Sequence, residues 1–475
     1  MAAIITDKLK NLVVDLIKAN DSDASNRYYA AIGRSEAWND SDVSPTPLRT
    51  KSEENDFRNS MQSMKLVADV SLVIPRYNWS SGTFYSAYDD TQVGNTNAYY
   101  VINANQQVYM VLRASVSATG TAVASTVEPT GNTTGTPFKT SDGYVWKFMY
   151  SISATDANKF QSANFMPVEF IDKDSAGGVS GARLAAFSSN QTEQLAIQEA
   201  SVLGQVVGYA IDNPGSGYSS APTLTITGDG SSAIATATIS GGAVVKVIPS
   251  EDVSGNLVQA NFGSGYNFAS VTVSGGSPDS AAIIRPILST SRRTHDSGGL
   301  GDDPVSDLRS NALMFNAKPS GAERADFFIN QQFRQVGLLK NPTDSAGVAF
   351  TEETGNALKT LNFVSLTKAF EKDQVITGGT SGAKAIVDFD STGSTGVAGG
   401  ALFIHQTDSN GFTPFTTGET ITASGGSSGV LIGGGNHDSS AEVNPNSGQL
   451  LYIDNRSAIT RASGQTEDLK IVIQV

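Results

Sequence analysis

The chain contains no cysteine among its 475 residues. Disulfide bonds, thiol nucleophiles, zinc sites with cysteine ligands and cysteine-ligated iron–sulfur clusters are therefore excluded. Histidine is also scarce, and His295, His405 and His437 lie in three separate segments without a second ligand at metal-site spacing. We therefore expect neither a histidine-based triad nor a zinc site, and interpret the three histidines as solvent-facing or structurally hydrogen-bonded.

Charged residues are few, at 16% of the chain against about 25% in an average soluble protein. The balance is acidic, because 46 Asp and Glu residues stand against 32 Lys and Arg residues and give a net charge of −14. This charge repels phosphate backbones and anionic surfaces, so we expect neither nucleic acid nor a membrane as a partner. The first twenty residues hold no apolar run long enough for a signal peptide or a membrane span, which predicts a soluble cytosolic product.

Glycine is abundant, with 47 residues, and much of the polarity comes from Ser, Thr and Asn. This composition suits short strands joined by many turns better than it suits helix bundles. We therefore predict a mainly β fold, with a β-sandwich core domain and a few helices. One helix opens the chain, because apolar residues between Ile5 and Ile17 recur at helical spacing. A helix of this length needs to dock on the protein body or on a second subunit.

Two pairs of internal repeats follow the aromatic N-terminal part of the chain. The tetrapeptide Gly-Ser-Gly-Tyr occurs at residues 215–218 and again at residues 263–266, each time between strand-like segments of similar pattern. A different glycine-rich pattern at residues 374–383 is echoed at residues 420–429. Each pair is interpreted as a small β-module.

These features divide the chain into four expected parts. Residues 1–171 together with 440–475 form a core domain, because the apolar C-terminal strand needs to pair inside a sheet or across a subunit interface. Residues 190–290 form an inserted β domain that holds the Gly-Ser-Gly-Tyr repeats. Residues 291–350 form a connecting β region, and residues 351–439 form a second inserted β-repeat domain.

No motif points to catalysis or to a cofactor. The first Gly-Ser-Gly segment lacks the third glycine and the helix of a dinucleotide-binding loop. A phosphate-loop reading of the segment before Lys384 fails, since Ala385 stands where Ser or Thr is needed. A calcium-loop reading that begins at Asp388 fails, since Gly399 stands where a bidentate Glu is needed. We expect no enzyme activity, cofactor, resident metal or small-molecule substrate.

Three compact clusters instead combine aromatic, arginine and turn residues. They are Ile-Gly-Arg-Ser-Glu-Ala-Trp at residues 32–38, Val-Ile-Pro-Arg-Tyr-Asn-Trp at 73–79 and Asp-Gly-Tyr-Val-Trp at 142–146. Arg and Trp are frequent interface anchors, because both bury a large area and keep a directional polar contact. A core Trp with a neighbouring Arg folded over it is the alternative, and both interpretations stay open.

Through these clusters the chain resembles the homodimeric baseplate wedge subunits of T4-like contractile-tailed phages. The similar stretches, in the same order along the chain, are residues 33–38, 73–76 with Trp79, 142–146, 333–335 with Asn341-Pro342, and 452–467 with the last apolar strand. Ala37 stands where the better-known member has a proline. The glycine-rich repeats have no counterpart in that member, and we interpret them as insertions.

The resemblance implies a structural virion protein rather than an enzyme. Subunits of this family form homodimers that join neighbouring baseplate wedge proteins, and the wedges assemble around a hub into the tail baseplate. The baseplate rearranges at the host surface and triggers contraction of the sheath. The chain is then made and assembled in the host cytoplasm and resides in the virion tail. The residues expected to anchor the core or an interface are Arg34, Glu36, Trp38, Arg76, Trp79, Tyr144, Trp146, Arg334, Tyr452 and Arg456.

A second hypothesis, from a different class, is a host-surface adhesin or tail-fibre protein that uses its β-repeat modules. In this hypothesis the Gly-Ser-Gly-Tyr turns display Tyr218 and Tyr266 as platforms for glycans. The alternative for these residues is a tyrosine ring packed over its own glycine turn. Glycan binding that is lost in Tyr218→Ala and Tyr266→Ala variants would favour the adhesin.

Overall fold

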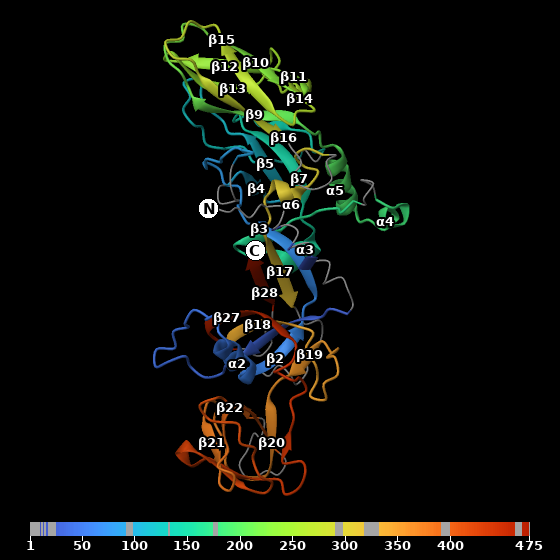
Figure 1. Ribbon diagram of the computed structural model, residues 1–475, viewed down its shortest axis with the longest axis vertical. Helices are drawn as coiled ribbons and strands as arrows, with labels where there is room; N and C mark the ends of the chain where they lie inside the picture. The colour runs from blue at the N-terminus through green and yellow to red at the C-terminus, as the bar shows by residue number, and fades with distance from the viewer. Residues whose placement is uncertain are drawn as a thin grey trace. The chain divides into compact units, whose positions relative to one another are not determined.

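The protein is mainly β, with 43% of its residues in strands and 11% in helices, so the predicted fold class is confirmed. The computed structural model describes residues 10, 13, 16–17, 25–91, 98–131, 134–173, 179–289, 298–317, 332–390, 400–460 and 468–474 (Figure 1). Within the predicted N-terminal helix only Lys10, Val13, Leu16 and Ile17 are described, and these four are helical. The remainder of that helix lies outside the described residues.

The chain divides into two compact units, each assembled from separate stretches of sequence. Unit 1 comprises residues 1–16, 71–314 and 473–475, and unit 2 comprises residues 17–70 and 315–472. The boundary between the units falls inside the expected core domain, because residues 17–70 and 440–472 belong to unit 2 and residues 71–171 belong to unit 1. The four expected parts stay an expectation.

Unit 2 contains a five-stranded antiparallel sheet in the order β19-β2-β1-β18-β27. Its strands are β1 (Tyr28–Gly33), β2 (Met61–Leu66), β18 (Gln332–Lys340), β19 (Thr354–Asn356) and β27 (Gln449–Thr460). Helix α2 (Lys51–Asn59) begins after Thr50, whose hydroxyl accepts a hydrogen bond from the backbone N–H of Glu53. Its buried Phe57 packs closely over Gly337 of β18, where a Cβ atom would lie 2.4 Å from the ring. Glycine at this position therefore allows the helix to pack directly against the sheet.

Unit 2 also contains a small barrel, closed by pairing between β20 and β23. Its strands are β20 (Lys359–Lys368), β21 (Val375–Gly378), β22 (Lys384–Asp390), β23 (Ala401–His405), β24 (Thr420–Ala423), β25 (Ser428–Leu431) and the short β26 (Asp438–Ser439), with the 3-10 turn η2 (Ser424–Gly426). The second glycine-rich repeat forms two hairpins, β21–β22 and β24–β25. They pair antiparallel with Thr377 opposite Thr422, so the two copies meet symmetrically in register.

In unit 1 the Gly-Ser-Gly-Tyr repeats build an interlocked β-module. Its elements are β9 (Gln205–Asn213), β10 (Thr223–Gly228), β11 (Ser231–Ala233), β12 (Ala235–Ser240), β13 (Ala243–Pro249), η1 (Gln259–Asn261), β14 (Phe262–Ser264), β15 (Ala269–Ser274) and β16 (Ile283–Ser289). The pairs are β9–β16, β10–β15, β11–β14 and β12–β13. Each pair joins a strand of the first copy to a strand of the second. One copy alone would therefore leave its strands unpaired.

Unit 1 also holds an aromatic-rich antiparallel sheet in the order β4-β5-β7-β6. The remaining elements of unit 1 are β4 (Tyr100–Ile102), β5 (Gln107–Arg113), β6 (Phe138–Lys139), β7 (Val145–Ser151), α3 (Ala154–Phe160), β8 (Phe165–Pro167), α4 (Gly181–Ala185), α5 (Ser189–Glu199) and α6 (Pro304–Asp307). Strands β3 (Asp69–Pro75), β17 (Ala312–Ala317) and β28 (Leu469–Gln474) each have residues in both units. Strand β7 is almost entirely buried, with helix α5 packed against it.

Candidate functional site

The ten residues singled out in the sequence fall into two groups, one in each unit. Arg76, Trp79, Tyr144 and Trp146 belong to unit 1, and the other six belong to unit 2. Several members of the unit 2 group lie in one hydrogen-bonded cluster around the turn that follows β1. We call Arg34, Trp38, Asp42, Arg334 and the backbone of Arg456 the arginine–tryptophan cluster.

The unit 1 group lies in and beside the hydrophobic core. The rings of Tyr144 and Trp146 are fully buried and stacked, with centroids 5.6 Å apart and planes 23° apart. Trp79 is half-buried, and its indole N–H donates to the hydroxyl of Ser125 over 3.0 Å. Arg76 donates to the carbonyl of Ser162 over 3.0 Å and thereby ties the end of β3 to a neighbouring loop. Tyr144 and Trp146 are thus core residues, while Trp79 and Arg76 reach the surface.

The arginine–tryptophan cluster starts from an unusual backbone turn at the end of β1. A Cβ atom on Gly33 would lie 3.0 Å from the carbonyl oxygen of Ser60, so the two backbones approach closely. Arg34 has φ of 61°, in the left-handed region that costs a non-glycine residue about 1–2 kcal/mol. Its backbone N–H donates to the same Ser60 carbonyl over 3.0 Å. The turn aims the Arg34 guanidinium at the ring of Trp38, with 4.3 Å between its central carbon and the ring centroid.

Trp38 connects this turn to the edge strand of the sheet. Its indole Nε1–H donates to the carbonyl oxygen of Arg456 on β27 over 2.9 Å. Its backbone N–H donates to a carboxylate oxygen of Asp42 over 3.1 Å. The Arg456 side chain makes a separate, partly exposed ion pair with Asp454 at 2.7 Å. The cluster therefore uses the backbone of Arg456 rather than its charge.

Arg334 fixes the same turn from the sheet side. It is buried on β18, and its Nε and Nη2 donate to the two carboxylate oxygens of Asp42 over 2.7 and 2.8 Å. Its Nη1 also donates to the backbone carbonyl of Ser35. Bidentate pairs of this kind are both stronger and more directional than single charged contacts. The Arg334 hydrogen bond is the main reason that the pKa of Asp42 lies below its usual value.

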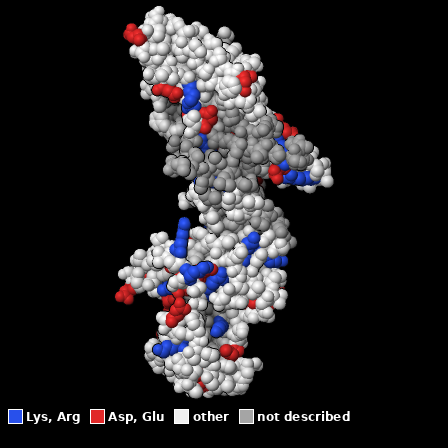
Figure 2. All heavy atoms as spheres, in the orientation of Figure 1, with Lys and Arg blue, Asp and Glu red and all other residues white. Residues whose placement is uncertain are grey.

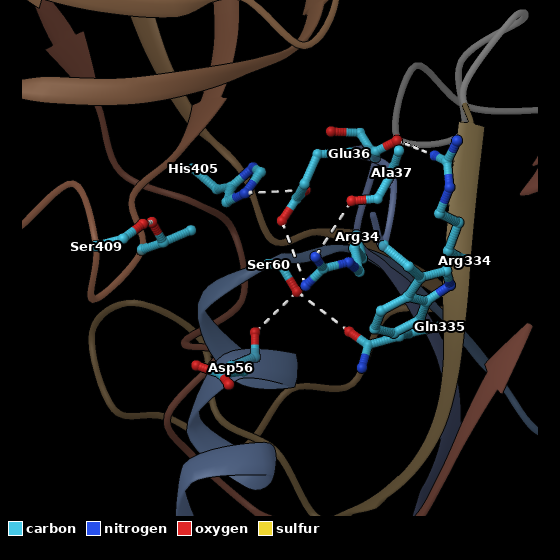
Figure 3. Close-up of polar contacts among 12 residues, drawn as sticks. Arg34, Glu36, Ala37, Asp56, Ser60, Arg334, Gln335, His405 and Ser409 are labelled. Carbon is cyan, nitrogen blue, oxygen red and sulfur yellow. Dashed lines mark hydrogen bonds and ion pairs between the residues drawn. The ribbon is translucent and has the colours of Figure 1, made fainter. Parts of the chain in front are cut away.

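Tyr452 and Glu36 are the two remaining residues of the unit 2 group. Tyr452 lies on β27 opposite Leu338, and burial raises the pKa of its hydroxyl. Glu36 lies beside the cluster, with an oxygen 3.5 Å from Arg34 Nη1. The other carboxylate oxygen of Glu36 faces His405 of the barrel, at 3.5 Å from Nε2 (Figure 3). Glu36 therefore lies between the Arg34 guanidinium, in the turn after β1, and the His405 ring of the barrel.

Sequence reasoning missed the buried pair of His405 and Asp388. Their side chains, 2% and 1% exposed, join through a 2.6 Å contact between Nδ1 and Oδ2. Gln62 of β2 donates to the other Asp388 oxygen over 3.1 Å. Burial acts to lower the pKa of His405, but the Asp388 and Glu36 carboxylates outweigh it and leave that pKa raised. The two residues lie on neighbouring strands, a relation that depends on sheet register and has no local sequence signal. His405 is structurally hydrogen-bonded, one of the two interpretations offered for it.

The Gly-Ser-Gly-Tyr turns do not display their tyrosines. Tyr218 is 4% exposed and Tyr266 is 3% exposed, and each ring contacts a glycine of the module. The Tyr218 hydroxyl accepts a hydrogen bond from the backbone N–H of Ala282 over 2.8 Å. Of the two interpretations offered for these tyrosines, the packed ring is therefore confirmed and the display as a glycan platform is not, because both rings form part of the core between the two repeat copies.

The described parts of the chain contain no group of three or more acidic, histidine or cysteine side chains that could hold a metal ion. Within the same ranges, no helix is both long and apolar enough to cross a membrane. The arginine–tryptophan cluster is a set of directional hydrogen bonds that join the turn after β1 to β18 and β27. The pair of His405 and Asp388 is buried and can take up a proton. No family model matches the chain, and a search of curated proteins finds no significant match.

Proposed function

We propose that the chain is a structural subunit of the tail baseplate of a contractile-tailed phage. In this role it forms a homodimer that links neighbouring wedge proteins, without catalytic residues or a cofactor. The observation that carries the proposal is the meeting of three family-like stretches, residues 33–38, 333–335 and 455–456, in the arginine–tryptophan cluster. Short motifs that resemble a family by chance would have no reason to bond to one another across the chain.

The placement of the unmatched segments also supports the proposal. Both glycine-rich repeat pairs build β-modules whose strands pair mainly among themselves, namely the barrel and the interlocked module. Segments of this kind can be inserted into a scaffold without breaking its own sheet. The family-like stretches in unit 2 lie on β1, β18 and β27, which are adjacent strands of one sheet.

The proposed mechanism is the burial of preformed surfaces in stable subunit contacts. Trp38 and Trp79 are each held by an indole hydrogen bond yet remain half-buried, so each has ring surface left for a partner. Aromatic anchors that are already fixed lose little conformational entropy on association. Interfaces between rigid subunits switch between discrete packings, which suits an assembly that rearranges on a signal.

The proposal is tested on contractile-tailed particles that carry this gene. We expect an antibody against the chain to label the end of the tail distal to the head, and mass spectrometry of purified particles to detect the chain. Particles that lack the chain, or labelling confined to the head or the fibres, would overturn the proposal.

A further inference from the structure

Unit 2 contains a cavity of about 510 Å³ between the barrel and the segment that follows it. This volume lies within the range of about 300–1,000 Å³ typical of small-molecule sites. Lys359, Gln406 and Phe412 line it from the barrel, and residues 440–441 and 443–446 line it from the other side. The cavity is separate from the arginine–tryptophan cluster, none of whose members lines it.

The lining mixes polar and apolar side chains, and its titratable members among the described residues are Lys359 and His405. Although the chain carries 46 acidic residues, no Asp or Glu is among the described residues that line the cavity. The polar side chains are mostly amides and hydroxyls, from Asn59, Ser345, Gln406, Ser440, Asn444 and Asn446. Charged side chains are also sparse over the visible face of the barrel (Figure 2).

Several of these polar groups have unused hydrogen-bonding capacity. The side-chain amide of Asn446 makes no hydrogen bond to another residue that the structure describes, and Asn444 uses only its oxygen, which accepts from the backbone N–H of Asn446 over 3.0 Å. Gln406 has both amide hydrogens committed, to the carbonyls of Lys384 and Thr413, which leaves its oxygen to accept. The cavity thus offers donors and acceptors together.

Phe412 adds an exposed aromatic ring to this polar lining. Phe412 is 54% exposed, so its ring contributes little hydrophobic burial to the core of the barrel. The loop that carries it is held in place, because the Gln406 amide donates to the carbonyl of Thr413 over 2.9 Å and the Gly411 N–H donates to the carbonyl of Thr407 over 2.9 Å. A fixed ring beside amides can stack on one apolar face of a ligand while its polar edges are hydrogen-bonded.

We propose that this cavity binds a neutral saccharide of one or two rings, with Phe412 against a C–H face of the sugar and the amides of Gln406, Asn444 and Asn446 on its hydroxyls. A wholly apolar ligand would make no use of these donors and acceptors, whereas the hydroxyls of a sugar can pair with them. A multiply charged anion would find Lys359 as the only lysine or arginine among the described lining residues. This site differs from the repeat tyrosines, which are buried, and adds a ligand class that the proposed structural role does not require.

The proposal is tested on the purified full chain by saturation-transfer difference NMR. The probes are the methyl glycosides of glucose, galactose, mannose and N-acetylglucosamine. We expect saturation transfer to the C–H protons of at least one of these sugars. Phe412→Ala is expected to weaken that binding about tenfold, a stacking contribution of about 1.4 kcal/mol, and Phe412→Tyr to retain it.

Phe268→Ala is the matched control, because Phe268 is also exposed, at 66%, but belongs to unit 1. It should leave the sugar signals unchanged. Three results would overturn the proposal: no transfer to any of the four probes, undiminished transfer in Phe412→Ala, or displacement of the neutral sugar by glucuronate that disappears in Lys359→Ala. Circular dichroism of each variant verifies that its fold is retained.

Discussion

Trp38 donates its indole N–H to the carbonyl oxygen of Arg456 over 2.9 Å, across 418 positions of sequence. This bond joins the turn after the first described strand to an edge strand near the end of the chain. It exists because Arg34 takes a left-handed conformation and because Arg334 holds Asp42 in place. The bond therefore joins the turn after β1 to the edge strand β27 of the same sheet, from two segments that are far apart in the sequence.

The first prediction concerns this bond. We expect Trp38→Ala to lower the free energy of unfolding by about 2 kcal/mol, from the lost cation–π contact, hydrogen bond and half-buried ring. Arg456→Ala should cost much less, because it removes an exposed ion pair and leaves the accepting carbonyl in place. Denaturant titrations followed by circular dichroism measure both. An equal loss of unfolding free energy in the two variants would contradict the Arg456 backbone carbonyl as the acceptor of the Trp38 hydrogen bond.

The second prediction concerns the bidentate pair of Arg334 and Asp42. Arg334→Ala should destabilise the protein by about 2 kcal/mol or more, because it leaves the Ser35 carbonyl and the Asp42 carboxylate without their donor. Arg334→Lys should recover only part of this loss, since an ammonium group cannot bond both oxygens in the same geometry. Asp42→Asn should lower the free energy of unfolding by less than Arg334→Ala does. A fully stable Arg334→Ala variant would show that the pair does not hold the turn.

The third prediction is a pH dependence from His405. Its pKa is raised above the ordinary 6.5, so the folded protein binds a proton more tightly than the unfolded chain. The stabilising contribution is then fully present below pH 6.5 and is lost as the pH rises through the raised value. His405→Gln can still donate to Asp388 but cannot titrate. Unfolding free energies measured across this window should fall with pH in the natural chain relative to His405→Gln, and parallel profiles would contradict the assignment.

The fourth prediction compares two glycines of the interlocked module. Gly263 has φ of 61°, and a Cβ atom there would lie 2.4 Å from the carbonyl oxygen of Ser231. Gly275 has φ of 75° but open space around it. Gly275→Ala should cost about 1–2 kcal/mol of conformational strain, and Gly263→Ala clearly more, because backbone must also move. Thermal unfolding ranks the two variants, and equal costs would mean that the close approach at Gly263 has no role.

The fifth prediction concerns assembly. If Trp38 and Arg76 contribute to subunit contacts, Trp38→Ala and Arg76→Ala should reduce incorporation of the chain into baseplate wedges. Co-purification with the neighbouring wedge proteins measures this effect, and the soluble yield of each variant separates it from misfolding. Normal incorporation of both variants would remove these residues from the interface.

Composition and local pattern are sufficient to predict part of this structure. A glycine-rich and β-branched composition predicts the mainly β fold, and the local pattern of residues 32–38 marks Arg34 and Trp38. Arg334 is marked only by the resemblance to the family. The buried pair of His405 and Asp388 was not accessible in this way, because it depends on the register between β22 and β23. The burial of Tyr218 was accessible, because a ring packed over its own glycine turn was one of the two interpretations, and Tyr218 does lie against Gly215 of that turn.

The proposed homodimer is tested most directly by the mass of the purified full chain in solution. Sedimentation equilibrium over a wide range of loading concentrations should give twice the chain mass at every concentration. A stable trimer would contradict the wedge architecture and favour a fibre or adhesin, and a monomer at all concentrations would contradict the dimer itself.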